Sequence, residues 1–340
     1  MIQAIRDEID RHRRRLGRKL HVGVFKLGGH GDFMQQLAFA RAVRRRWPRR
    51  EATLTLVSKF DNSGANDAML QGCDFVDSAI QVPAADWRML VQELAPAFDV
   101  LYDVQYVAGA YFRSLRRFAA EQLAANTRLA RYAYYYSRFP WSNAELAETG
   151  QSQWEMLARS SGLDVSDDDL FIEPAAEPGT VPGEPYVTLH NAAGGRAAAK
   201  CLPMGVADAI AARVRAMGFV AVHVGTRGEE PIAGCLDRRG LRIHATAAVI
   251  AGARLHVDIE GGLVYIARAV GTRSVVFFGP TPVATFGFQG NVNVSLARCR
   301  PCWWSRPGWE RACPRGHPHC RNLPDAAQAA DAVARALEEG

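Results

Sequence analysis

The sequence contains no apolar stretch that approaches the ~18 residues needed to span a bilayer. Its first 19 residues are highly charged and lack the apolar segment of a secretory signal. It also has no short internal repeat and no low-complexity tract. These absences exclude a membrane-spanning or secreted class, and we expect a cytoplasmic protein built from ordinary globular domains.

The length of 340 residues is enough for two domains of roughly 150 residues each. The net charge of +6 is unevenly distributed, because residues 1–50 hold 14 Lys and Arg against four Asp and Glu. The basic side chains form two groups: Arg11, Arg13, Arg14, Arg15, Arg18 and Lys19, then Arg44, Arg45, Arg46, Arg49 and Arg50. Such a field either attracts anionic lipid headgroups, phosphorylated glycans or nucleic acid, or belongs to a solvated helix face.

Apolar strands and amphipathic helices alternate in both halves of the chain, which predicts parallel sheets. The expected strands are 21–25, 53–57, 100–104, 186–190, 219–224, 255–257 and 274–278, and the expected helices are 2–16, 33–46, 86–94, 111–136, 204–217 and 325–337. Residues 62–66 are expected to form a loop. Residues 173–184 contain three prolines and two glycines and are the clearest linker. We therefore predict an α/β fold with an N-terminal domain over 1–180 and a C-terminal domain over 181–340.

The first motif is Lys26-Leu-Gly-Gly-His-Gly-Asp32, which directly follows an apolar strand. Ligands of open α/β sheets bind at the carboxyl ends of the strands. Its glycines allow the backbone to approach a ligand closely, but they form neither a G-x-G-x-x-G fingerprint nor a P-loop. Asp32 near a helix start is either a capping residue or a general base that takes the proton of a substrate hydroxyl.

The second motif is Val257-Asp-Ile-Glu-Gly-Gly-Leu263, again between a strand and a helix. The free N–H groups of a helix that begins at Gly261 and Gly262 would bind a diphosphate. Glu260 is placed to accept hydrogen bonds from a ribose, or it is a plain cap. Lys200 follows another strand and would neutralise a phosphate leaving group, unless it is an ordinary surface lysine. The segment from Gly225 and Thr226 to Glu229 and Glu230 follows a further strand and would contact the nucleoside.

The third motif is a group of four cysteines: Cys299, Cys302, Cys313 and Cys320. Thiolates at this spacing predict a tetrahedral structural zinc site, although tetrathiolate iron has similar needs. His317 or His319 would serve as an alternative ligand. A cluster of free thiols remains open, whereas disulfides are disfavoured in the cytoplasm.

These motifs resemble glycosyltransferase family nine, the family of the bacterial lipopolysaccharide heptosyltransferases, over about residues 22–337. The likeness rests on Gly31-Asp32, on Gly261-Gly-Leu with Ala267-Arg-Ala-Val-Gly271, and on Phe277-Phe-Gly-Pro-Thr-Pro282. The cysteine segment is similar to one found in many members. The autotransporter heptosyltransferase branch uses a similar four-cysteine finger to hold iron.

The resemblance implies a GT-B architecture, in which two Rossmann-like domains with parallel sheets face a central cleft. Family members transfer a sugar, with inversion and without a catalytic metal, from a nucleotide-diphosphate donor to a hydroxyl. By this likeness Asp32 is the base, and Gly29, His30 and Gly31 lie on the acceptor side. Lys200 contacts the donor diphosphate.

Further donor-side residues follow from the same resemblance. They are Gly225, Thr226, Glu229, Glu230, Glu260, Gly261, Gly262, Leu263 and Tyr265. The sequence departs from the family pattern at three of these positions: Glu260 replaces the usual Asp, Gly261 the usual Ser or Thr, and Tyr265 the usual His. These changes concern the donor pocket and therefore the identity of the sugar.

We therefore expect a glycosyltransferase of cell-envelope biogenesis that uses ADP-heptose or a related donor. Its acceptor would be a surface glycan, a lipid-linked glycan or a protein, and the basic segments would favour peripheral association with the anionic inner leaflet. One alternative is a nucleic-acid-binding protein with a metal finger, although the basic residues and the cysteines lie at opposite ends of the chain. A GT-B nucleotide-sugar epimerase is the other alternative.

Overall fold

In the computed structural model, the apolar run Leu20–Lys26 forms β1, which is buried along almost its whole length. The model describes residues 19–26, 28–82, 97–104, 108–112, 150–193, 199–295, 299, 301–302, 313, 316, 320 and 325–339. The predicted helices 2–16 and 86–94 lie outside these residues. The chain divides into an N-terminal unit, Met1–Pro140 with Gln153–Phe171, and a C-terminal unit, Trp141–Ser152 with Ile172–Gly340.

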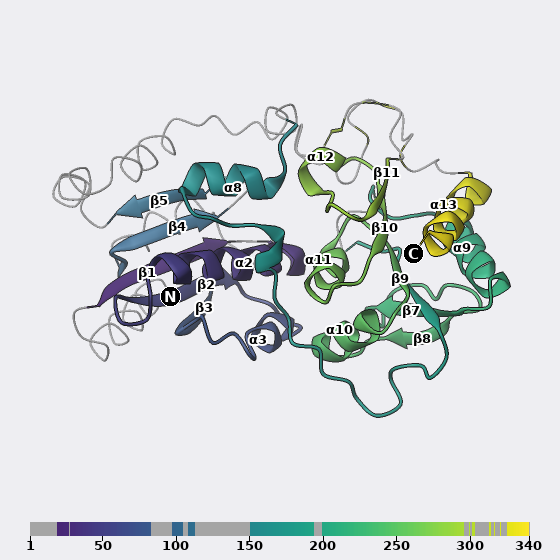
Figure 1. Cartoon of the computed structure of the whole chain (residues 1–340), viewed down its shortest axis with the longest axis horizontal. Helices are drawn as coiled ribbons and strands as arrows, with labels where there is room; N and C mark the ends of the chain where they lie inside the picture. Colours follow the sequence, from purple (N-terminus) through teal and green to yellow (C-terminus); the bar gives the residue numbers. More distant parts are fainter. Residues whose placement is uncertain are drawn as a thin grey trace. The chain divides into compact units, whose positions relative to one another are not determined.

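The sheet of the N-terminal unit has the strand order β3-β2-β1-β4-β5 (Figure 1). Its strands are β1, β2 (Ala52–Lys59), β3 (Ser78–Val82), β4 (Val100–Val104) and β5 (Ala108–Phe112). All pairs are parallel except β4 with β5, which is antiparallel. The helical prediction for residues 111–136 is therefore wrong at 111 and 112, which belong to β5, and its remainder lies outside the described residues.

Helix α2 (His30–Arg46) packs on β1 and β2 and supplies much of the core of this unit. It begins three residues before the predicted start, so that Asp32 lies in its first turn. The other helical elements are α3 (Ala65–Met69), α8 (Gln153–Ser161) and the short 3-10 helix η2 (Asp167–Asp169). The first residues of α3 overlap the loop predicted over 62–66, which therefore ends earlier than expected.

The sheet of the C-terminal unit is entirely parallel, in the order β11-β10-β9-β6-β7-β8. Its strands are β6 (Tyr186–Leu189), β7 (Val220–Gly225), β8 (Leu236–Arg239), β9 (Leu255–Ile259), β10 (Ser274–Phe278) and β11 (Val292–Ser295). Counted from β6, this is the 3-2-1-4-5-6 order of a Rossmann sheet. The order reverses between β6 and β9, which is where such sheets bind ligands.

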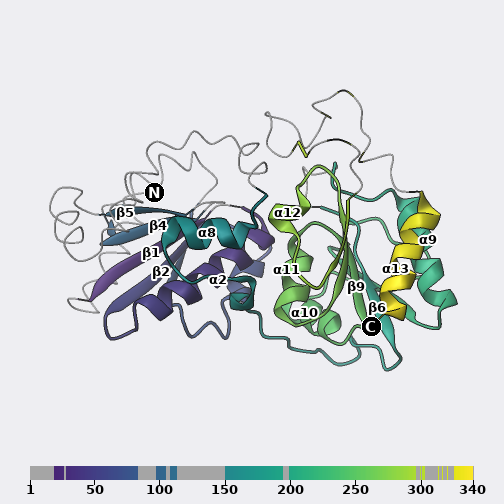
Figure 2. The same ribbon diagram turned by 45° about the horizontal axis from the view of Figure 1, so that its top comes forward.

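Helices cover both faces of the C-terminal sheet, as Figures 1 and 2 both show. One face carries α9 (Met204–Ala216) and α13 (Ala326–Glu338), and the other carries α10 (Ile243–Ala251) and α11 (Gly262–Ala269). A short helix, α12 (Val283–Phe286), follows β10. The main apolar core lies on the α9 and α13 side, where residues such as Val214 and Val333 are fully buried. Each such side chain contributes about 1.5–3 kcal/mol to the free energy of unfolding.

The predicted linker, residues 173–184, contains no helix or strand. The two units divide after Phe171, shortly before this linker. No helix in the described ranges combines the length and the apolar composition needed to cross a bilayer.

Candidate functional site

Asp32 lies at the carboxyl end of β1, in the first turn of α2. Its Oδ2 accepts a hydrogen bond from the backbone N–H of Gly29 at 3.0 Å, so it ties down the residue that precedes the helix. A Cβ added at Gly28 would collide with this carboxylate, which explains a glycine at that position. One third of the Asp32 side chain is exposed. The carboxylate is therefore both a capping group and accessible to a ligand.

The buried partner of Asp32 is Lys26, a residue that sequence reasoning did not select. The Lys26 side chain is 1% exposed, and its Nζ lies 3.2 Å from Asp32 Oδ1. The same ammonium donates to the backbone oxygen of Val104 at 3.3 Å, at the end of the neighbouring strand β4. Because β1 and β4 flank the point where the strand order reverses, this ion pair occupies the ligand-binding position of the sheet.

Two loops meet beside this position. His30, which is half-exposed at the start of α2, places its Nε2 3.6 Å from Asp61 Oδ2 and 3.5 Å from the Ser63 hydroxyl, both in the loop after β2. Burial alone would raise the pKa of Asp61, but hydrogen bonds from Ser63 and Asn66 outweigh it and lower this pKa. The predicted acceptor-side turn is thus anchored to the loop that follows the adjacent strand.

In the C-terminal unit, Lys200 and Glu260 form an ion pair between Nζ and Oε2. They are 60 residues apart in the sequence, and both were predicted to bind the donor. Glu260 follows β9, and Lys200 lies in the loop after β6, so the pair sits where the strand order of the second sheet reverses. The Lys200 side chain is 18% exposed and that of Glu260 is 10% exposed.

The helix α11 begins directly after this pair. Gly261 precedes the helix in an extended conformation, and Gly262 is its first residue. The first amides of a helix have no intrahelical acceptor, so they are available to an anion. Leu263 packs partly buried against the α10 side of the sheet. Tyr265 is 6% exposed and meets Phe288 edge to face at 5.2 Å, so its ring belongs to the core.

The segment after β7 forms a tight turn around Glu229. Glu229 Oε1 accepts hydrogen bonds from the backbone N–H and the hydroxyl of Thr226, both at 2.9 Å. Gly225 has φ +140°, and a Cβ there would collide with Glu229. The side chain of Glu229 is therefore folded inward and 15% exposed, whereas Thr226 and Glu230 are exposed.

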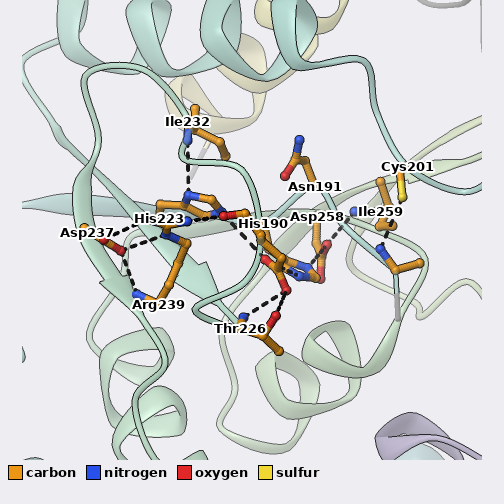
Figure 3. A network of polar contacts seen from close by, with 12 residues as sticks. His190, Asn191, Cys201, His223, Thr226, Ile232, Asp237, Arg239, Asp258 and Ile259 are labelled. Atoms are coloured by element: carbon orange, nitrogen blue, oxygen red, sulfur yellow. Dashed lines mark hydrogen bonds and ion pairs between the residues drawn. The ribbon is translucent and has the colours of Figure 1, made fainter. Parts of the chain in front are cut away.

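Sequence reasoning also missed a row of polar side chains inside the central strands. Thr188 and His256 are hydrogen-bonded at 3.0 Å. Two residues further along each segment, His190 Nδ1, just after β6, lies 2.7 Å from Asp258 Oδ1 on β9 (Figure 3). Strands that are buried on both faces are normally continuously apolar. Polar residues at every second position of two adjacent strands are the signal that would have found this row.

Two carboxylates flank His190. Its Nε2 lies 3.4 Å from Glu229 Oε2, opposite the contact with Asp258. Burial alone would lower the pKa of His190, but Asp258 and Glu229 outweigh it and raise this pKa to about 10. Contacts with His190 in turn lower the pKa values of Asp258 and Glu229 despite their burial. The three groups are therefore an imidazolium between two carboxylates at neutral pH.

A second histidine, His223, approaches Glu229 from β7. Its Nδ1 accepts the backbone N–H of Ile232 at 3.2 Å (Figure 3). Its Nε2 lies 3.8 Å from Glu229 Oε2. Burial and the charge of Arg239 lower the pKa of His223 to about 4. This histidine is therefore neutral at pH 7, with its proton on Nε2 because Nδ1 is an acceptor.

Two of the four cysteines, Cys302 and Cys320, lie beside Gly279 and Pro280, which also neighbour Ala199 and Lys200. The Cys302 N–H donates to the Pro280 oxygen at 3.0 Å, and a Cβ added at Gly279 would lie 3.5 Å from Cys320 Cβ and 3.1 Å from the Ala199 oxygen. Among the residues that the structure describes, no group of three or more His, Cys, Asp or Glu side chains is gathered around a metal position. His317 and His319 lie outside those residues, and the predicted site at Cys299, Cys302, Cys313 and Cys320 stays a prediction.

The second basic group has partners within its own unit. Arg44 pairs with Asp77 and donates to the backbone oxygens of Phe75 and Ala52, and Arg45 pairs with Asp169. The Arg44 side chain is only 12% exposed. It therefore stabilises the packing of this unit and is not part of an anion-binding surface. The Arg50 side chain, which is 82% exposed, fits the solvated-face reading.

We expect Arg44→Ala to lower the free energy of unfolding by about 1–3 kcal/mol, because it leaves buried acceptors without their donor. Urea denaturation measures this loss. Arg50→Ala is the matched control, since its exposed ion pair is worth at most about 1 kcal/mol. If the Arg44→Ala protein kept its stability but no longer bound polyanions, Arg44 would be part of an anion-binding surface instead.

No family model matches the chain, and no curated protein matches it. Several solved structures do. A family 9 glycosyl transferase from Veillonella parvula DSM 2008 superimposes with a TM-score of 0.61 at 14% identity, over 94% of this chain and 98% of that one. The iron-containing dodecameric glycosyltransferase TibC from enterotoxigenic E. coli H10407 gives 0.60 at 16% identity, over 95% and 79%. The E. coli ADP-heptose LPS heptosyltransferase II gives 0.54 at 15% identity, over 94% and 99%.

At these identities the likeness concerns the fold. Each unit has a mostly or wholly parallel sheet of Rossmann type, which confirms the predicted fold class. The chain shares the GT-B fold, two Rossmann-like units in one chain, with the structures of glycosyltransferase family 9 and of the heptosyltransferases.

Proposed function

We propose that the protein is an inverting glycosyltransferase that moves a sugar from a nucleotide-diphosphate donor to an acceptor hydroxyl. The observation that carries the proposal is the Lys200–Glu260 ion pair beside the start of α11. A cation and free helix amides at the strand-order reversal of a Rossmann sheet suit a diphosphate. The shared fold with glycosyltransferases supports the same reading.

On the donor side, Lys200 and the first amides of α11 would bind the diphosphate. When the bond between the anomeric carbon and the diphosphate oxygen breaks, its electron pair passes to that oxygen. Lys200 and the helix start would stabilise this developing charge. Glu260, as the present partner of Lys200, would orient the ammonium and accept a hydrogen bond from the donor sugar or ribose. The reaction as proposed uses no catalytic metal.

On the acceptor side, Asp32 would take the proton of the acceptor hydroxyl while the oxygen of that hydroxyl bonds to the anomeric carbon. Two of the acceptor positions of the carboxylate are occupied by Lys26 and Gly29, and a carboxylate has about four. Positions therefore remain for a substrate hydroxyl. Lys26 would hold the group in one orientation, which is what general-base catalysis requires.

ADP-heptose is the donor that we propose, and a surface glycan, a lipid-linked glycan or a protein is the acceptor. TibC was solved with ADP-D-β-D-heptose, and a second neighbour is named an ADP-heptose heptosyltransferase. Glu260, Gly261 and Tyr265 depart from the family residues. The ring of Tyr265 packs against Phe288, whereas Glu260 pairs with Lys200 and Gly261 precedes α11, so Glu260 and Gly261 are the departures that would alter donor preference.

A thermal-shift screen against ADP, GDP, UDP, CMP and their sugars tests this proposal. A ligand present at 100 times its Kd adds about 2.7 kcal/mol to the folded state, which raises the melting temperature. We expect stabilisation by one nucleoside diphosphate, ADP first. No shift with any nucleotide, together with steeply salt-dependent binding to DNA or RNA, would favour the nucleic-acid alternative. Conversion of the donor sugar without an acceptor would favour the epimerase.

We also propose that Cys299, Cys302, Cys313 and Cys320 hold zinc or iron as a structural site. Cys302 and Cys320 lie beside Gly279 and Pro280, which neighbour Lys200. A metal bound by these cysteines would therefore stabilise the backbone around Lys200. We expect about one metal per purified chain by elemental analysis, and a lower melting temperature after chelation. Cys302→Ser should reproduce the loss, and Cys73→Ser, in the other unit, should not. A metal-free protein of full stability would contradict the proposal.

A further inference from the structure

A continuous set of polar contacts runs from the interior of the C-terminal sheet to the exposed turn at the carboxyl end of β7. It starts at Asp258, which is fully buried, passes through His190 and Glu229, and ends at the exposed hydroxyl of Thr226. Figure 3 shows His190, Asp258 and Thr226 gathered at the ends of their strands. Each link joins groups from a different part of the fold, namely β9, the residue after β6 and the turn after β7.

Glu229 is badly placed for a direct contact with a nucleoside. Its Oε2 is buried between His190 and His223, and its Oε1 already accepts both the N–H and the O–H of Thr226. Both oxygens therefore face protein groups: Oε1 accepts hydrogen bonds, and Oε2 is buried at ion-pair distances from the two histidines without a hydrogen bond. Glu229 therefore influences a bound ligand through Thr226, which is the exposed member of the pair.

The hydrogen-bond direction of the Thr226 hydroxyl is fixed as a result. Because an ionised carboxylate only accepts hydrogen bonds, the Thr226 proton points to Glu229, and the lone pairs of Thr226 Oγ1 are left for a ligand. A ligand at this position must donate, as a sugar hydroxyl does. The position follows β7, a neighbour of the strand that leads to Lys200.

We propose that His190, held by Asp258, is a positioning residue that fixes Glu229 so that Thr226 accepts a hydrogen bond from a ribose hydroxyl of the donor. This inference rests on the proposed function. His190 supplies the positive charge that keeps Glu229 ionised and turned inward. Without it, two buried carboxylates would face each other without a cation between them, and the turn at Gly225 and Thr226 would lose its anchor.

The test compares ligands as well as variants. Calorimetry gives the affinities of ADP, GDP, UDP and CDP, of their 2′,3′-dideoxy counterparts and of the matching monophosphates. In the wild type we expect about tenfold tighter binding of one ribonucleoside diphosphate than of its dideoxy form. In His190→Gln and Thr226→Val this ratio should fall towards one. The ratio of diphosphate to monophosphate should stay as in the wild type, because Lys200 and α11 are unchanged.

A purely structural role would weaken all ligands in parallel and leave the ribose ratio intact, so that result would overturn the inference. His244→Gln and Thr180→Val, in the same unit, are the matched controls and should keep the wild-type ratio. Should His190→Gln fail to fold, the exposed Thr226→Val decides, and an unchanged ratio there also overturns the inference. A wild type that binds no nucleotide would defeat the proposed function itself, and this inference with it. A wild type that binds but ignores the ribose hydroxyls would defeat the inference alone.

Discussion

Asp32→Asn should lower the rate of sugar transfer by about 10²–10⁴-fold while leaving the affinity for the donor largely unchanged. The asparagine side chain keeps an acceptor for the Gly29 N–H, so the helix start is preserved. It cannot take a proton from the acceptor hydroxyl. Initial rates of transfer and calorimetric donor binding, measured on the same preparation, check the two halves of this prediction.

The ion pair with Lys26 complicates the reading of that variant. The buried ammonium would lose a charged partner, which we expect to lower the free energy of unfolding by about 1–3 kcal/mol. Lys26→Met separates the two effects, since it keeps the carboxylate and removes the group that orients it. Asp74→Asn, at an exposed aspartate of the same unit, is the control for the chemical change. Transfer that survives in Asp32→Asn within a few fold would leave Asp32 as a capping residue only.

Lys200→Met should weaken binding of the nucleoside diphosphate by about ten- to a hundredfold. A hydrogen bond to a charged group is worth about 1.5–3 kcal/mol, and each 1.4 kcal/mol is a factor of ten in affinity. Binding of the corresponding nucleoside should change little, because it carries no phosphate. Calorimetry with both ligands measures the difference, and Lys59→Met, at an exposed lysine of the other unit, is the control.

Glu260 must be considered in the same experiment, because Lys200→Met leaves the nearly buried Glu260 carboxylate without its cation. A bare carboxylate would itself repel a diphosphate. The double variant Lys200→Met/Glu260→Gln removes that repulsion. If the ammonium binds the diphosphate, the double variant stays weak. Recovery of wild-type affinity would show instead that Lys200 only neutralises Glu260.

The parts of the fold that the sequence predicts are its buried central strands. The runs at Val100–Val104 and Ser274–Phe278 are mostly apolar and buried at every position, and both strands have the predicted bounds. The strands that were missed or misread are β3, β5, β8 and β11, and each lies at the edge of its sheet. Edge strands are half-solvated, so a segment such as Leu236–Arg239 carries charged residues and gives no apolar signal.

The candidate site was predictable where residue type and position coincide. Asp32, Lys200 and Glu260 follow strands and lie in or beside glycine turns, and the structure pairs Lys200 with Glu260. Lys26 was not predictable in this way, because it ends an apolar strand and its burial depends on the Val104 oxygen across the sheet. His190 became part of the site only through the register of β6 with β9, a contact between residues 68 positions apart.

We propose above that the C-terminal unit binds a nucleoside diphosphate at Lys200 and the start of α11. A crystal structure of the protein with the nucleoside diphosphate that stabilises it tests this claim most directly. We expect the diphosphate within hydrogen-bond distance of Lys200 Nζ and of the Gly262 and Leu263 amides, with the ribose beside Thr226. A nucleotide bound elsewhere in the chain, with the Lys200–Glu260 pair intact and away from the phosphates, would contradict it.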